Sequence, residues 1–143
     1  PLMRQFILFI LSCCTLNVLA AQTEISNATV RQPLPGKTLS AGYFSIRNTG
    51  TNPIALLAVT SPQFDSVELH AHQMTDGMMQ MVEVDKIAVA PGQSVHLQPG
   101  GLHLMLFGPT QPIQLGQQVP LQLRWSDGTM QSVSANVTRI PKQ

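Results

Sequence analysis

The stretch Leu102-His103-Leu104-Met105-Leu106, which follows the turn-forming Pro99-Gly100-Gly101, places a leucine at every second position. Side chains two apart in a β-strand share one face of the sheet, so the alternation predicts a strand over residues 102–107 with its leucines in the core. His103 and Met105 then lie on the opposite face. There we expect them to be within reach of another molecule.

Short apolar segments of this kind recur from Gln22 to Arg139. The segments are rich in Val, Leu, Thr and Ser, and they are separated by Pro, Gly, Asn and Asp. None of them keeps an apolar 3.6-residue period for three turns. Short strands between turn residues predict an all-β sandwich or barrel. The strands that we expect span residues 24–31, 40–48, 54–61, 66–71, 78–84, 87–89, 94–98, 102–107, 118–125 and 130–139.

The first 21 residues differ in character from the rest. Arg4 precedes a short apolar run and several small residues, and polar sequence begins at Gln22, a pattern typical of a cleavable secretory signal. We therefore expect a signal peptide over residues 1–21, with Pro1 and Leu2 extraneous to an initiator at Met3, and one domain over residues 22–143. The expected location is the periplasm, without stable membrane insertion. The rival interpretation is a lipoprotein signal with Cys13 acylated, which the leucine before Ser12 and the brevity of the apolar run disfavour.

Cysteine and charge exclude several classes of function. Both cysteines, Cys13 and Cys14, lie in the N-terminal segment, so the expected domain has no disulfide, no thiolate ligand and no blue-copper centre. Without Arg4, seven of the eight Lys and Arg residues remain against seven Asp and Glu residues, a formal net charge of zero. Because nucleic-acid binding calls for a basic surface, we expect no nucleic-acid partner.

Histidine and methionine cluster in one part of the chain. All four histidines and five of the seven methionines fall within residues 70–105. Thioether sulfur is a good ligand for the soft ion Cu(I) and a poor one for zinc, magnesium or calcium. The grouping of His70, Met81, His103 and Met105 therefore predicts a Cu(I) site built from uncharged ligands.

The hairpin register leaves the first ligand open. If Asp76-Gly77 forms a two-residue turn, cross-strand partners have numbers that sum to 153, so His72 faces Met81 and His70 lies diagonal to it. Either histidine can then reach the ion, and Met79 on the same face is an auxiliary candidate.

Two further residues are weaker candidates. The same arithmetic around Pro99-Gly100 places His96 opposite His103, as a supporting residue. Glu68 lies close to the cluster, where a carboxylate can orient a ligand histidine.

Four segments together resemble the PCu(A)C family of periplasmic copper(I) chaperones. They are Val67-Glu68-Leu69-His70, Asp76-Gly77-Met78-Met79-Gln80-Met81, Ala90-Pro91-Gly92 and Pro99-Gly100-Gly101-Leu102-His103-Leu104-Met105-Leu106. The hallmark of that family is a histidine, ten residues, a methionine, twenty-one residues and a His-x-Met triplet, and both spacings match. The similarity extends over nearly the whole expected domain.

The resemblance implies a cupredoxin-like Greek-key β-sandwich or barrel that binds one Cu(I) in an exposed site formed by His70, Met81, His103 and Met105. It also implies delivery of that copper towards the Cu(A) centre of cytochrome c oxidase subunit II, alongside Sco-type proteins. We expect a monomer. The chain ends without the His- and Met-rich tail of some relatives, which argues against a second copper site there.

Two other functions stay open. The protein can instead buffer copper or confer copper resistance, without a dedicated acceptor. A Met-rich surface can also serve a β-sandwich interaction domain that binds no metal. We expect no enzyme and no catalytic residues, because no nucleophile elbow, H-E-x-x-H pattern or paired carboxylate site is present.

Overall fold

The computed structural model describes residues 22–139, so the expected signal peptide over residues 1–21 lies outside the described residues. The described part consists of strands, turns and loops, which confirms the expected all-β class. No helix in it is long and apolar enough to cross a membrane. The strands are β1 (Thr23–Arg31), β2 (Leu39–Asn48), β3 (Ile54–Thr60), β4 (Phe64–Thr75), β5 (Met78–Glu83), β6 (Ile87–Val89), β7 (Ser94–His96), β8 (His103–Pro109), β9 (Gln118–Trp125) and β10 (Met130–Thr138).

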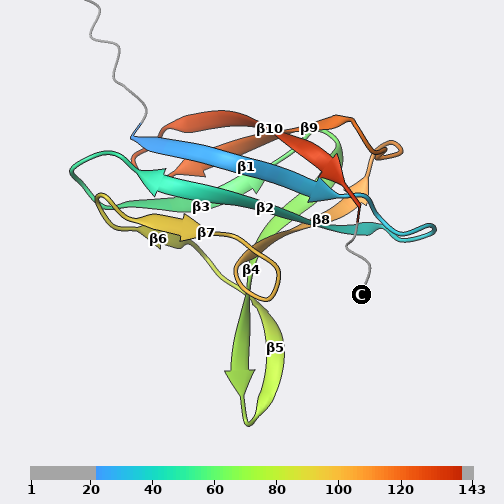
Figure 1. Ribbon diagram of the computed structural model, residues 1–143, viewed down its shortest axis with the longest axis horizontal. Coiled ribbons are helices and arrows are strands. Elements are labelled where there is room, and N and C mark those ends of the chain that lie inside the picture. The colour runs from blue at the N-terminus through green and yellow to red at the C-terminus, as the bar shows by residue number, and fades with distance from the viewer. Residues whose placement is uncertain (1–21, 140–143) are drawn as a thin grey trace, which may run out of the picture.

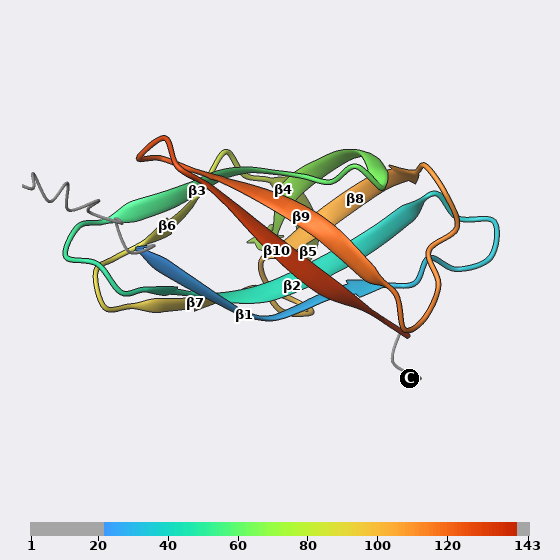
Figure 2. The same ribbon diagram turned by 90° about the horizontal axis from the view of Figure 1, so that it is seen from above.

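All of these strands join one hydrogen-bonded sheet, which curls into a flattened barrel (Figure 1, Figure 2). The order is β5-β4-β8-β2-β1-β10-β9-β3-β6, and β7 pairs with β2 beside this path. Only β1 and β10 run parallel; the other pairs are antiparallel. Strands β3 and β4 lie near opposite ends of this order, and they contact each other. The two ends of the sheet therefore come together around one core.

The alternation of side chains decides which face of each strand enters the core. In β9, Val119, Leu121, Leu123 and Trp125 are buried, whereas the residues between them are exposed. In β8, Leu104 and Leu106 are fully buried, as predicted, and Leu102 packs partly buried against the same core. His103 and Met105 accordingly lie on the other face of β8.

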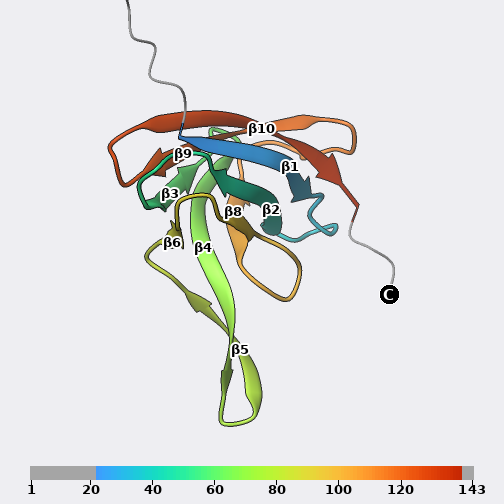
Figure 3. The same cartoon turned by 60° about the vertical axis from the view of Figure 1, so that its left-hand side comes forward.

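Strand β4 is longer than predicted, and this extension shapes the molecule. The sequence predicted a strand over residues 66–71, whereas β4 runs to Thr75 and pairs along its end with β5. Asp76 and Gly77 both have positive φ, at 50° and 77°, which is the geometry of a two-residue type I′ turn. The β4–β5 hairpin therefore continues beyond the barrel and projects from it (Figure 1, Figure 3).

Candidate metal site

Strand order brings the predicted ligands together. Strand β8 lies between β4 and β2, and residues that face each other across two strands share one side of the sheet. His70 lies opposite His103 in β8, and His72 lies opposite Met81 in β5. Met105 lies opposite Glu68, so all of these side chains stand on the face away from the core.

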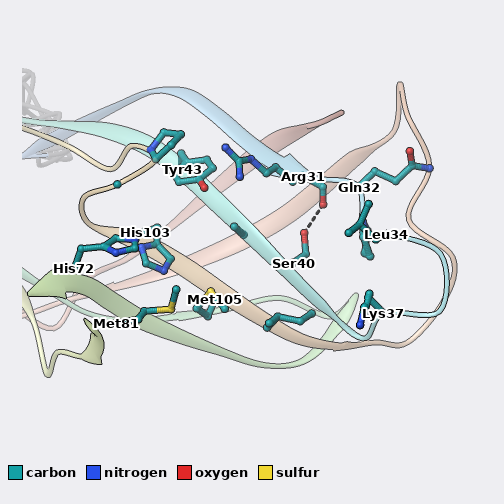
Figure 4. Close-up of a pocket in the computed structure, with 15 residues that line it drawn as sticks. Arg31, Gln32, Leu34, Lys37, Ser40, Tyr43, His72, Met81, His103 and Met105 are labelled. Atoms are coloured by element: carbon teal, nitrogen blue, oxygen red, sulfur yellow. Dashed lines mark hydrogen bonds between the residues drawn. The ribbon is translucent and has the colours of Figure 1, made fainter. Parts of the chain in front are cut away.

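A pocket of about 510 Å³ opens on this face. His72, Met81, His103 and Met105 line one end of it (Figure 4). The ring centres of His72 and His103 are 5.2 Å apart, and those of His70 and His103 are 5.7 Å apart. His70 borders this group without lining the pocket, so both His70 and His72 lie next to His103.

The depth of the site differs from the expectation of an exposed cluster. His103 is 3% exposed and Met105 8%, whereas Met81 is 49% exposed. The physical reason is position: β8 is a central strand flanked by β4 and β2, whereas β5 is the edge strand of the hairpin. The site therefore has a buried floor and an open rim.

His103 is held in one tautomer. Its Nδ1 lies 2.9 Å from the carbonyl oxygen of Gly101, which can only accept, so Nδ1 carries the proton and donates. Burial lowers the pKa of His103 below its ordinary value; the Gly101 hydrogen bond opposes this, and the nearby His72 and His70 add to it. A neutral ring with a free Nε2 lone pair is the form that binds a metal.

His70 shows the same arrangement with the opposite nitrogen. Its Nε2 lies 2.8 Å from Oε2 of Glu68, so Nε2–H donates to the carboxylate. Its Nδ1 is buried and has no hydrogen-bond partner among the described residues. A buried, unpaired ring nitrogen on a histidine anchored by a carboxylate is the pattern of a metal ligand with its supporting group.

The prediction that His96 lies opposite His103 is wrong. Strand β7 pairs with β2, where His96 faces Ser45, and the Nδ1 of His96 lies 2.7 Å from the Oγ of that serine. Strands β7 and β8 both pair with the same edge of β2, one after the other, so the Pro99-Gly100 turn does not fold them into a hairpin. His96 therefore lies farther along β2 and does not line the pocket.

The predicted auxiliary residue Met79 lies outside the pocket. It faces Met74 across the hairpin, two residues from Met81 and farther from the barrel, and is 57% exposed.

Tyr43 and Arg31 are among the pocket residues that sequence reasoning missed. The Arg31 guanidinium carbon lies 5.0 Å from the centre of the Tyr43 ring, a cation–π contact. Burial raises the pKa of Tyr43, and the charge of Arg31 opposes the rise. The available signal was alternation, because the neighbouring Phe44 is a core residue and Tyr43 must point to the other face.

The donor atoms define the chemistry that this site can perform. Within residues 22–139, no group of three or more His, Cys, Asp and Glu side chains is placed to hold a metal ion. The donors gathered here are imidazole nitrogens and two thioether sulfurs, all uncharged. Such a set suits a soft monovalent ion.

Comparison with solved structures defines the class of protein. The fold is that of the copper-bound PCuAC domain from PmoF2, with a TM-score of 0.72, 24% identity and coverage of 84% of this chain and 95% of that one. The solution structure of CuI-DR1885 from Deinococcus radiodurans matches with a TM-score of 0.60 and 30% identity, over 79% of this chain and 76% of that one. The cupredoxin-like, PCu(A)C-type fold that the sequence resemblance implied is thereby confirmed.

Sequence comparison shows the family to which the chain belongs. Residues 23–137 match the family described as "Putative lipoprotein LpqE-like". A relative from Leifsonia xyli subsp. xyli, described as "Putative lipoprotein Lxx21020", is 31% identical over 115 residues, which are 80% of this chain and 68% of that protein. The chain belongs to the LpqE-like family.

Proposed function

We propose that this protein is an exported Cu(I) chaperone that binds one Cu(I) and passes it to a cuproprotein. The observation that carries the proposal is the pairing of His70 and His103, which face each other with one ring nitrogen anchored and the other free. The two thioethers that complete the set, Met81 and Met105, lie on the same face. The ligands are then His103, Met105, Met81 and His70, with His72 as the rival for the last position.

Neutral donors favour the reduced ion. Cu(II) prefers harder nitrogen and oxygen donors, and thioethers select Cu(I). Because the site contains no thiol that has to lose a proton to bind the ion, binding near neutral pH releases few protons. The protein holds copper reduced and performs no bond-making catalysis on it.

The difference in exposure between the two sulfurs gives an order of release. Met81 on the open rim is the ligand that an incoming acceptor displaces first, whereas His103 and Met105 on the buried floor exchange last. Each exchange forms one copper–ligand bond and breaks one, and the ion stays Cu(I) throughout.

The comparisons support this proposal at the level of the class. The matched domain from PmoF2 is described as copper-bound and the matched DR1885 structure as CuI-DR1885. By extension, we propose the Cu(A) centre of cytochrome c oxidase subunit II as acceptor, with Sco-type proteins as partners and the periplasm as location. Copper buffering is the alternative, and it differs by having no acceptor.

Titration tests the proposal. The purified protein is titrated anaerobically with Cu(I) against a coloured chelator, and compared with the Met81→Leu/Met105→Leu double variant. The Met78→Leu/Met130→Leu double variant is the matched control, because it removes two exposed thioethers outside the pocket. We expect one tight equivalent that the first variant loses and the control keeps. Wild-type protein that fails to compete with the chelator overturns the proposal and leaves a Met-rich interaction surface.

A second measurement separates chaperone from buffer. Copper-loaded protein is mixed with the soluble Cu(A) domain of an oxidase subunit II, and the copper in each protein is measured after separation. Transfer supports the chaperone. Retention of all copper favours buffering.

A further inference from the structure

The projecting end of the β4–β5 hairpin carries thioethers that the proposed copper site does not use. Met74, Met78 and Met79 are 64%, 66% and 57% exposed. Large apolar side chains gathered on a protruding surface cost free energy in water and mark a binding function. None of the three belongs to the core cluster, so packing does not explain them.

Two of these methionines form a pair on the copper-binding face. Met74 and Met79 face each other directly across the hairpin, next to the pair formed by His72 and Met81. Side chains directly opposite in an antiparallel pair have Cβ atoms about 4.5–5.5 Å apart, so both flexible thioethers can reach one ion between them. Met78 pairs with Thr75 and points to the other face.

The spacing along the strands places the Met74–Met79 pair next to the proposed copper site. Alternate residues of a strand lie about 7 Å apart, which is the distance from the Met74–Met79 pair to the His72–Met81 pair. Met81 is itself the exposed rim of the pocket. An ion held by the outer pair therefore lies next to the ligand that exchanges most readily.

The charge of the hairpin favours a cation. Between Phe64 and Glu83 the chain has four carboxylates and neither lysine nor arginine, although the described domain as a whole is close to neutral. A surface of one sign raises the local concentration of ions of the opposite sign and speeds their arrival.

We propose that Met74 and Met79 form a second, weaker Cu(I) site at the end of the hairpin, through which copper enters and leaves the inner site. This inference rests on the proposed function of the inner site. The outer ion is held by two copper–sulfur bonds, to Met74 and Met79. The ion moves inward when a bond to the Met81 sulfur replaces one of these copper–sulfur bonds. Bonds to histidine nitrogen then replace the other, and the oxidation state of the copper does not change.

Methyl NMR of the methionines tests the two sites separately. The purified protein, carrying ¹³C in its methionine methyl groups, is titrated anaerobically with Cu(I) in acetonitrile-containing buffer. The first equivalent is expected to shift Met81 and Met105. The second is expected to shift Met74 and Met79 together and to leave Met78 and Met130 in place. If Met81 and Met105 do not respond to the first equivalent, the proposed function fails. If they respond but the second equivalent shifts all exposed methionines alike, or none, only the outer site is overturned.

Kinetics test the role of the outer pair in transfer. We compare Met74→Leu/Met79→Leu with the control Met78→Leu/Met130→Leu, using Cu(I)–bicinchoninate as the copper donor. Because neither Met74 nor Met79 is a ligand of the inner site, its affinity is expected to stay within about twofold. The rate of copper uptake is expected to fall about tenfold in the first variant only. Equal uptake rates in both variants overturn the relay.

Discussion

The Nε2 of His70 lies 2.8 Å from Oε2 of Glu68, and this contact leaves the buried Nδ1 of His70 without a partner among the described residues. A carboxylate that accepts from one ring nitrogen fixes the orientation of the ring and raises the basicity of the other nitrogen. Loss of such a supporting group typically lowers metal affinity about 10–100-fold. We expect Glu68→Ala to lower Cu(I) affinity by about tenfold in a chelator competition. Glu68→Gln, which can still accept the hydrogen bond, is expected to lose less. An unchanged affinity in Glu68→Ala contradicts the role assigned to His70.

Two histidines compete for one position in the site, and single variants distinguish them. We expect His70→Gln to weaken Cu(I) binding by about tenfold or more, which corresponds to about 1.4 kcal/mol of binding free energy. His72→Gln is expected to weaken binding less. The reason is that, of these two histidines, only His70 has a ring held by a hydrogen bond and a buried nitrogen without a partner among the described residues. The measurement is the same competition titration, with His96→Gln as the control. The reverse order of effects assigns the position to His72.

The stability of the copper-free protein is expected to fall below about pH 6.5, the ordinary pKa of histidine. Burial lowers the pKa of His103 in the folded protein, so between the two pKa values this histidine is protonated in the unfolded chain and neutral in the folded one. Stability is therefore unaffected by this group above its ordinary pKa and decreases as the pH falls towards the lowered one. Urea unfolding from pH 8 to pH 5 measures the effect, and His103→Gln should have a smaller slope. A slope identical to that of wild type would mean that other groups control the acid sensitivity.

Adjacent residues of β8 are expected to separate stability from copper binding. Leu104 is fully buried in the core, so Leu104→Ala should lower the free energy of unfolding by about 2–5 kcal/mol. Met105 lies on the opposite face, and the near-isosteric Met105→Leu should cost less than about 1.5 kcal/mol while it weakens Cu(I) binding. Urea unfolding and copper titration of both variants check the contrast. A large loss of stability in Met105→Leu would assign that side chain to packing instead.

Mass spectrometry of the exported protein will decide how the N-terminal segment is processed. We expect cleavage after Ala20 or Ala21, which yields an unmodified chain. The rival interpretation is acylation of Cys13. A lipid-modified mass that disappears in Cys13→Ser would contradict cleavage at the alanines. Cys14→Ser is the control.

Local pattern determined the strands and the hairpin. Alternation in β9 and β8 gave the core face of each strand, because the two-residue period of side chains is a property of the strand itself. The Asp76-Gly77 turn fixed the pairing of His72 with Met81 for a similar reason, since a two-residue turn leaves only one register. The spacing of His70, Met81, His103 and Met105 also identified the family and the ion, because donor type is a chemical property of the side chain.

Only the tertiary structure decided how these strands meet. That β8 lies between β4 and β2, and so buries His103 beside Tyr43, depends on pairings between distant segments that no local period encodes. Long-range pairing also explains why His96 lies outside the pocket, because β7 and β8 share an edge of β2 instead of pairing with each other. The sequence by itself determined which residues are candidate ligands and which face of its strand each occupies. Long-range strand order decided which of them are buried and which one remains exposed, because burial depends on the strands that pack on either side.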